Sequence, residues 1–338
     1  MKNLPISSTP RRKRNILLLL AGLTLLSVVL SLCVGSVRLS VGEVCSVLTG
    51  RTDSGTAYTI LRHSRLPRTF GCVLAGCALA VSGAIIQSVL ANPLAAPNII
   101  GVNSGAGLMV ALGCALFPKY AAALPVMAFL GALGGVLLVL FLARRTGAAR
   151  ITLVLAGVAV SSIFSAGIDA VVTFVPEALN AYSDFRIGGM DNLTLERLLP
   201  ACAVILPACA GSLLLCPELD VLMLGADTAL SLGLNVRRVR LILLTLGAAL
   251  AGGAVSFCGL LGFVGLIVPH IIRRLVGEES RTLLFGCAFG GAALLTVCDV
   301  LARTLFSPYV LPVGIVLSLL GGPFFIWLLL GQRGGRGA

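Results

Sequence analysis

Charged residues are scarce in this sequence. Only 11% of the 338 residues are Asp, Glu, Lys or Arg, and 58% are hydrophobic, whereas soluble domains carry about 25% charged residues. Four long stretches contain no charge at all: 69–117, 120–143, 282–298 and 304–332. Because about 20 apolar residues in a helix cross a bilayer, these stretches exclude a soluble domain and predict an integral membrane protein.

Motifs for catalysis and nucleotide binding are also missing. The sequence has no G-x-x-x-x-G-K-[ST] phosphate loop, no H-E-x-x-H zinc helix and no G-x-S-x-G turn. Its eleven cysteines form no C-x-x-C pair, and most lie in apolar stretches, where they are expected to act as small packing residues. We therefore expect no catalytic residue, no metal site and no cofactor, and any use of ATP would need a separate ATPase.

Basic residues exceed acidic residues, which gives a net charge of +12. They gather at the ends of the apolar stretches, which favours a role in membrane orientation over nucleic-acid binding. With ten spans and an inner N-terminus, 16 of the 25 Lys and Arg residues fall on the inner side. Both termini are therefore predicted to be cytoplasmic. The apolar run 16–34 is interpreted as a retained first helix, not a cleaved signal peptide.

The apolar stretches predict an all-α, polytopic membrane protein with about ten transmembrane helices in one domain, 1–338. The predicted spans are 15–35, 68–90, 98–117, 121–142, 151–175, 197–216, 239–258, 260–276, 282–299 and 311–330. The chain has 40 glycines, and their spread through these spans favours close helix–helix packing in lipid. No separate soluble domain is expected, because the longest polar connections are only 36–67, 176–196 and 217–238.

The outer loop 36–67 is an exception to the rule that Lys and Arg gather on the inner side of the membrane. The loop and the start of span two carry five arginines and only two acidic residues: Arg38, Arg51, Arg62, Arg65 and Arg68 against Glu43 and Asp53. Two interpretations stay open. The arginines are membrane anchors on a solvated loop, or they form a docking surface for an acidic partner, since charges at an interface rim steer association.

The inner segment 217–238 is too polar to span the membrane and too apolar for a free loop. Its pattern predicts two short helices, the first with Leu219, Val221 and Leu222 and ending at Gly225. Asp227 is expected to cap the second helix, which exposes Leu230 and ends at Gly233. Such a pair could insert into a hydrophobic groove on another protein. The alternative is a re-entrant or interfacial segment.

Three other polar positions lie in or beside apolar spans. Asp169 lies near the outer end of span five, where a snorkelling or vestibule-facing position is favoured over a proton relay. His270 lacks other ligands at metal-binding spacing and is interpreted as a packed or interfacial residue. Asp299 and Arg303 are four residues apart and are expected to pair on one helix face.

Four motif-bearing stretches together resemble the FecCD-type permease subunits of ATP-driven importers for iron–siderophores, haem and cobalamin. They are RLPRTFGCVLAGCALAVSGAIIQSVLANPLAAPNIIGVNSGAG (65–107), LGADTALSLGLNVRRVR (224–240), GFVGLIVPHIIRRLVG (262–277) and LPVGIVLSLLGGPFFIWLL (311–329). The resemblance implies the type II importer permease fold, a homodimer or a pair with a close paralogue, two cytoplasmic ATPase subunits and an extracytoplasmic substrate-binding protein. It also implies the inner membrane of a bacterium and a path lined by span five and the last span.

Individual residues take roles from this resemblance. Arg65, Arg68 and Arg303 match arginines that meet glutamates of the binding protein. The segment 218–235 matches the paired coupling helices that contact the ATPase, with the following positions assigned to coupling: Leu222, Leu224, Gly225, Asp227, Leu230 and Gly233.

Two other classes of function compete with the importer. An ion-driven secondary transporter needs buried ionisable residues near the bilayer midplane, and Asp169 is the one candidate that the spans offer. A membrane enzyme needs a catalytic constellation, which the sequence lacks. Within the importer class, the cargo is expected to be a ferric siderophore or similar iron chelate, with cobalamin or haem as alternatives.

Overall fold

The computed structural model describes residues 9–35, 37–145, 150–191, 193–307 and 309–333, and these residues form helices with no strand among them. The ten predicted spans each contain one main helix, in chain order α1 (Pro10–Cys33), α4 (Leu66–Leu90), α5 (Val102–Leu116), α6 (Leu124–Arg145), α7 (Arg150–Phe174), α9 (Leu195–Leu214), α12 (Val236–Cys258), α13 (Val264–Val276), α14 (Ser280–Thr304) and α15 (Val313–Arg333). The all-α prediction is confirmed.

Short helices fill the connections. The outer loop forms α2 (Val41–Leu48), α3 (Thr56–Ile60) and a π-helical turn over Leu61–Arg65, which runs directly into α4. Between α7 and α9 lies α8 (Ala178–Ile187), and between α9 and α12 lie α10 (Cys216–Met223) and α11 (Ala226–Ser231). The predicted span 98–117 is not one helix, because a 3₁₀ turn over Pro97–Ile100 is separated from α5 by Gly101 at a φ of 88°.

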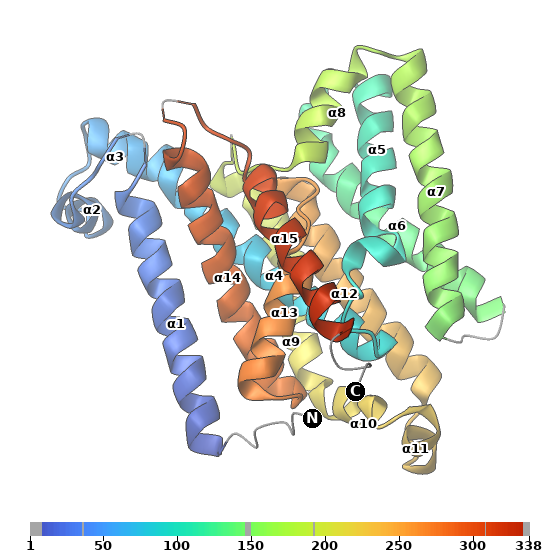
Figure 1. Ribbon diagram of the computed structural model, residues 1–338. Coiled ribbons are helices and arrows are strands. Elements are labelled where there is room, and N and C mark those ends of the chain that lie inside the picture. The colour runs from blue at the N-terminus through green and yellow to red at the C-terminus, as the bar shows by residue number, and fades with distance from the viewer. Residues whose placement is uncertain (1–8, 36, 146–149, 192, 308, 334–338) are drawn as a thin grey trace.

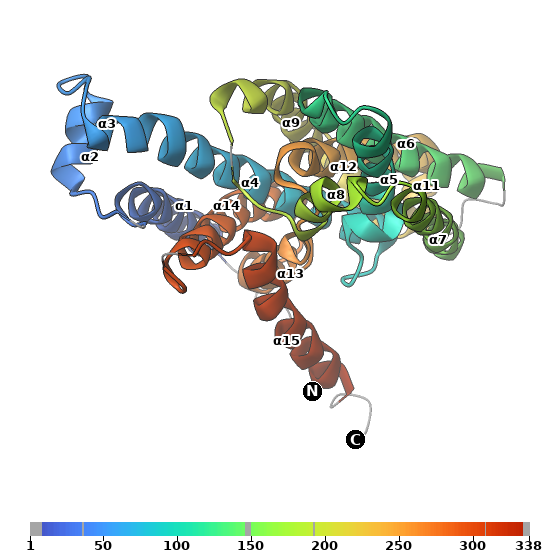
Figure 2. The same cartoon turned by 90° about the horizontal axis from the view of Figure 1, so that it is seen from above.

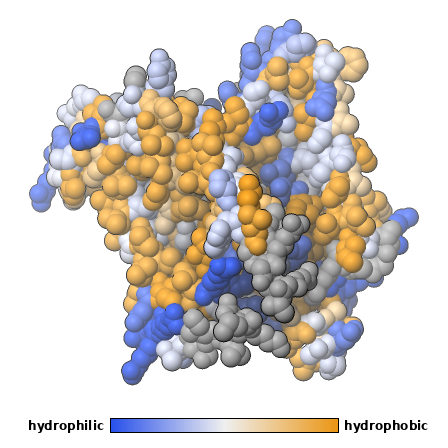
Figure 3. Space-filling view, viewed as in Figure 1, coloured by the Kyte–Doolittle hydropathy of each residue, from blue (hydrophilic) through white to orange (hydrophobic). Residues whose placement is uncertain are grey.

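Seven helices among the described residues are long and apolar enough to cross a membrane: α1, the α3–α4 run, α6, α7, α9, α12 and α14. Helices α5 and α15 are apolar but shorter by this measure, and α13 has only 13 residues. The count of ten crossings therefore stays a prediction. Leu18, Leu19 and Leu25 of α1 are more than 60% exposed, as lipid contact requires, and Figure 3 shows hydrophobic residues over most of this face.

Helix α4 forms the centre of the bundle. Of its 25 residues 21 are buried, and it packs against α12, α13 and α14. Two of these contacts are made by backbone against backbone: a methyl group on Gly76 would overlap the carbonyl oxygen of Gly291, and one on Gly83 would overlap that of Gly265. Small residues allow this close approach. In lipid the hydrophobic effect does not drive helices together, so close van der Waals packing stabilises the bundle instead.

The two ends of the bundle differ. Helices α2, α3 and α8 lie at one end, and α10 and α11 lie at the other (Figure 1). Helix α1 begins at the α10–α11 end and α15 runs towards it (Figure 1). Seen from above, α15 projects from one side of the bundle, while α9 lies on the opposite side (Figure 2).

Candidate functional site

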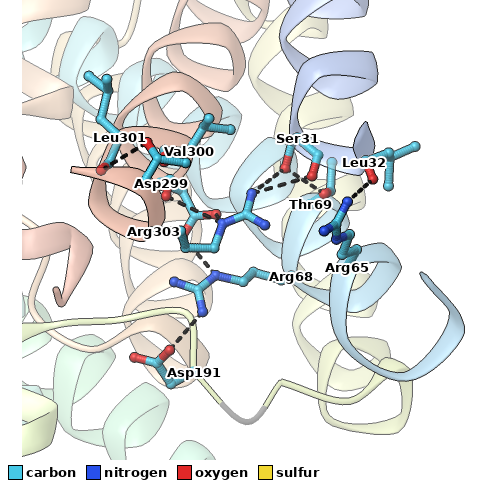
Figure 4. A network of polar contacts seen from close by, with 11 residues as sticks. Ser31, Leu32, Arg65, Arg68, Thr69, Asp191, Asp299, Val300, Leu301 and Arg303 are labelled. Carbon is cyan, nitrogen blue, oxygen red and sulfur yellow. Dashed lines mark hydrogen bonds and ion pairs between the residues drawn. The ribbon is translucent and has the colours of Figure 1, made fainter. Parts of the chain in front are cut away.

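A buried carboxylate organises the end of the bundle that carries α2, α3 and α8, which is predicted to face outward and is called the outer end below. Asp299 of α14 is 0% exposed and lies between two arginines. Arg68 of α4 donates from Nε to its Oδ1 at 2.9 Å, and Arg303, one turn further along α14, lies with Nε 3.0 Å from its Oδ2 (Figure 4). The predicted Asp299–Arg303 pair is confirmed, and Arg68 extends it to a second helix.

Arg303 and a third arginine, Arg65, hold the end of α1. Arg303 donates from Nη2 to Ser31 Oγ at 2.9 Å, and Arg65 donates from Nη1 to the Leu32 carbonyl oxygen at 2.5 Å and from Nη2 to that of Val37 (Figure 4). Because the last carbonyls of a helix have no partner within the helix, Arg65 satisfies a group that would otherwise be unpaired. The cluster therefore joins α1, α4 and α14.

The three arginines assigned to docking are thus not free at the surface. Arg65, Arg68 and Arg303 are only 4%, 9% and 8% exposed. The docking interpretation expects Arg65 and Arg68 to be accessible. This part of it is wrong, because most of their donors bond to the Leu32 and Val37 carbonyls and to the carboxylates of Asp299 and Asp191. Arg38, Arg51 and Arg62 of the outer loop are exposed. Whether the buried three also bind a partner stays a prediction.

Asp191, in the loop after α8, was not singled out from the sequence. Its Oδ1 accepts from Arg68 Nη1 at 2.7 Å, and its side chain is 51% exposed. Arg68 Nη2 is buried and has no hydrogen-bond partner among the described residues. Arg68 therefore has one deeply buried partner, one partner at the surface and one unused donor.

At the opposite end, α10 and α11 form the two short helices predicted for 217–238. Gly225 has a φ of 111° and Gly233 a φ of 83°, so both adopt the left-handed conformations that favour glycine. At the end of α11, Leu234 N bonds to Ala229 O at 2.9 Å and Gly233 N bonds to Leu230 O at 2.9 Å. This pair of bonds is a Schellman motif and confirms Gly233 as the terminating glycine.

Leucine side chains of this segment divide into two groups. Leu224 is 63% and Leu230 58% exposed, whereas Leu222 is 0% exposed and belongs to the buried side of α10. Leu222, which was assigned to coupling together with Leu224 and Leu230, is therefore not exposed for direct contact with a partner, and its role in coupling stays a prediction. Asp227 does not cap α11 either, since the N-cap residue is Gly225 and no side chain bonds to the first turn. Asp227 lies in that first turn, where its negative charge interacts favourably with the positive end of the helix dipole.

Helix α10 is attached to the start of α14. The Asp220 carboxylate accepts the backbone N–H of Ser280, the first residue of α14, at 2.8 Å. Beside it, Lys13 Nζ lies 2.6 Å from Glu279 Oε2, and this hydrogen bond lowers the pKa of the Glu279 carboxyl, with a smaller opposing effect from burial. The Asp220 contact could not be predicted from a motif, because it depends on the packing of segments 60 residues apart.

The motif residues Gln87 of α4 and Arg273 of α13 bond to each other. Arg273 donates from Nη1 to Gln87 Oε1 at 2.9 Å, and Gln87 donates to the Gly265 carbonyl oxygen at 3.2 Å. These bonds fix α13 against the end of α4. His270 packs edge-on against Phe324 of α15, with ring centres 6.0 Å apart. No three His, Cys, Asp or Glu side chains of the described residues are grouped to hold a metal ion.

Helix α7 presents a polar stripe beside an open groove of about 580 Å³. Ser161, Ser162, Ser165 and Asp169 line it together with Asn98 of the 3₁₀ turn. Asp169 is exposed here, which agrees with the vestibule-facing position predicted for it. The groove carries hydroxyl, amide and carboxylate groups but no arrangement for bond-breaking chemistry.

These features define a polytopic helical membrane protein with two short helices that expose leucines at one end and a buried polar cluster at the other. The chain belongs to the FecCD transport family, whose family model matches residues 23–331. It is 40% identical over 325 residues to the hemin transport system permease protein of Yersinia pestis, covering 94% of this chain and 96% of that protein. It is 37% identical over 280 residues to the Fe(3+) dicitrate transport system permease protein of Escherichia coli, covering 82% and 86% of the two chains.

A solved structure has the same fold. The chain superimposes with a TM-score of 0.85 on a metal-chelate type ABC transporter in an inward-facing conformation, at 29% identity, covering 94% of this chain and 99% of that chain. The family resemblance predicted from the motifs is therefore confirmed, and the relatives are transport permeases rather than enzymes.

Replacement of aspartate by asparagine is expected to lower the stability of the protein unequally at the two aspartates of the outer cluster. Asp299→Asn leaves two buried arginines without their carboxylate, and breaking such a pair costs about 3–5 kcal/mol. Asp191→Asn removes a half-exposed partner and should cost less than about 1 kcal/mol. Thermal unfolding of the two purified variants in one detergent measures the difference, and equal losses would contradict the central place given to Asp299.

The inner segment predicts a separation of folding from partner binding. Leu224→Asp with Leu230→Asp changes two exposed side chains and should leave folded yield unchanged while sharply reducing co-purification with the cognate ATPase. Leu222→Asp instead places a carboxylate at a fully buried position and should lower the folded yield itself. Wild-type co-purification of the Leu224–Leu230 double variant would exclude this surface from ATPase binding.

Proposed function

We propose that the chain is the permease subunit of an ATP-driven importer that moves iron, bound in an organic chelate, into the cytoplasm. The observation that carries this proposal is the α10–α11 segment, whose exposed Leu224 and Leu230 extend from a bundle that has no nucleotide-binding motif of its own. A helix pair with outward leucines suits a hydrophobic groove, here on a separate cytoplasmic ATPase. The reported relatives carry hemin and Fe(3+) dicitrate, which supports an iron chelate as cargo.

Within this proposal, two permease subunits form the path, either as a homodimer or with a close paralogue. The polar groove on α7 and the projecting α15 are the surfaces proposed to face that path. ATP binding would close the two ATPase subunits and move α10 and α11, so that the path alternates between outward and inward access. A weakly polar wall suits this role, because the cargo must pass without tight binding.

The proposed orientation places α10, α11 and both chain termini on the cytoplasmic side of a bacterial inner membrane, with α2, α3 and α8 outside. The excess of Lys and Arg on the inner segments supports it. A ferric siderophore or similar chelate is the proposed cargo, and haem or cobalamin import with the same architecture is the alternative. Specificity would lie mainly with the binding protein.

We further propose that this binding protein docks on the arginine-rich outer end. Arg38, Arg51 and Arg62 are exposed there and can meet acidic side chains directly. Arg68 can join them by partner exchange, because its Nη2 donor is unused and its bond to Asp191 lies at the surface. Arg65 and Arg303, whose donors go to the end of α1 and to Asp299, would hold the docking end in shape and reach a partner only by giving up those bonds.

Uptake into liposomes tests the proposed function. Vesicles containing the permease and its ATPase should accumulate an iron chelate only when both ATP and the loaded binding protein are present on their correct sides. Vesicles with an imposed proton or sodium gradient and no ATP serve as the control. Accumulation driven by the gradient alone would contradict the proposal and favour a secondary transporter.

Docking is tested by the affinity of the binding protein for reconstituted permease. Arg38→Glu with Arg62→Glu should weaken binding about tenfold at low ionic strength, and less at high ionic strength, because exposed charges are screened. Asp191→Asn should strengthen binding by freeing Arg68, and Arg145→Glu at the inner end is the charge-reversal control. Unchanged affinity in the outer double variant would assign those arginines to membrane anchoring.

A further inference from the structure

A pocket of about 240 Å³ lies at the inner end of the bundle, between α6, α7, α11 and α12. Its walls are apolar and come from all four helices, including Leu140, Leu153, Leu230 and Leu241. Its rim carries three arginines: Arg144 at the end of α6, and Arg237 and Arg240 at the start of α12. No function discussed above uses this pocket.

The charge of the pocket is one-sided. None of the lining residues is acidic, and the sequence has no Asp or Glu between 124 and 168 or between 228 and 277, which covers α6, α12 and most of α7. The fourth helix, α11, carries Asp227, which does not line the pocket. Arg144 and Arg237 are both exposed. An anion from outside the chain can therefore pair with these two arginines.

The position of the pocket, at the level where helices leave the membrane, fits a lipid headgroup. Arg144 lies in the last turn of α6 and Arg237 in the first turn of α12, so both stand where membrane-crossing helices leave the hydrocarbon. Leu137 and Phe141 share one face of α6 with Arg144 and are 46% and 52% exposed, which makes that face lipid-facing. The neighbouring Arg145 lies over the Phe141 ring, 5.1 Å from its centre, as basic residues do at a membrane interface.

We propose that this pocket binds an anionic glycerophospholipid of the leaflet at this end of the bundle. The headgroup phosphate lies between Arg144 and Arg237, and one acyl chain follows the wall formed by Leu140 and Leu241. Basic pockets between helices on the cytoplasmic side bind anionic lipid headgroups in this way. The apolar walls need a hydrocarbon chain, so a free phosphate ion does not satisfy the pocket.

The lipid would also contact the segment that meets the ATPase. Leu230 of α11 is one wall of the pocket, and α11 has six residues of which only Ala229 is buried. Such a short helix has little packing of its own. A bound acyl chain adds a contact to α11 from the membrane side and steadies its position against α12.

The test counts lipids retained on the purified full-length permease by native mass spectrometry during titration with phosphatidylglycerol. Arg144→Gln with Arg237→Gln should weaken the tightest phosphatidylglycerol site about 30-fold, since each arginine near a membrane surface contributes about 1 kcal/mol. Arg145→Gln with Arg238→Gln is the matched control. It removes the same charge from the same helix ends but from residues that do not line the pocket. Because charges further from the phosphate are screened, this variant should weaken the site by less than about threefold.

Further experiments distinguish a bound anionic lipid from the other possible occupants of the pocket. Phosphatidylcholine, with no net charge, and glycerol 3-phosphate, with no acyl chain, should each fail to compete for the site. Leu241→Phe, which narrows the pocket without changing its charge, should also weaken phosphatidylglycerol binding. Equal losses of phosphatidylglycerol affinity in the two double variants would show that diffuse surface charge, not the pocket, binds the lipid. Competition by glycerol 3-phosphate would show that the pocket is a phosphate site. Displacement of the lipid by the ATPase, with loss of ATPase binding in the Arg144–Arg237 variant, would assign the pocket to that interface; each of these results overturns the proposal.

Discussion

The buried carboxylate of Asp299 is the constraint on which the outer half of the bundle depends. A charge with no access to water must be paired, and this one is paired twice, by Arg68 from α4 and Arg303 from its own helix. The arginines have further donors, and these go to the end of α1 and to the surface residue Asp191. One buried charge thus fixes how three helices meet, while the contact of Gly76 with Gly291 brings the backbones of α4 and α14 close enough for it.

Helix α14 connects the outer arginine cluster to the α10–α11 segment at the opposite end of the bundle. Its 25 residues span about 37 Å, with the Ser280 N–H held by Asp220 of α10 at the inner end and Asp299 in the arginine cluster at the outer end. A binding protein that competes for Arg68 would disturb one end of this helix, and an ATPase that moves α10 would pull on the other. The continuous α-helix between them provides a stiff mechanical link without any change in its own hydrogen bonds.

Patterns within single segments were predictable, and contacts between distant segments were not. The uncharged stretches located the main helices, the four-residue spacing located the Asp299–Arg303 pair, and Gly233 marked the end of α11. The partners of Arg65 and Arg68 depend on α1, α4 and α14 lying side by side, and Asp299 is 231 residues from Arg68 in the chain. Leu222 was misplaced because a helix of eight residues is too short for its apolar period to separate the buried face from the exposed one.

Hydrogen exchange tests most directly the proposed transfer of a signal through α14, from the arginine cluster to the α10–α11 segment that we propose binds the ATPase. Binding protein is added to the assembled permease–ATPase complex in lipid nanodiscs, and amide exchange is followed across α10 and α11. We expect exchange there to change in the wild-type complex and to stay constant in Asp220→Ala, which detaches α10 from α14. An unchanged α10–α11 segment in a wild-type complex that transports, or a full response in Asp220→Ala, would contradict the connection through α14.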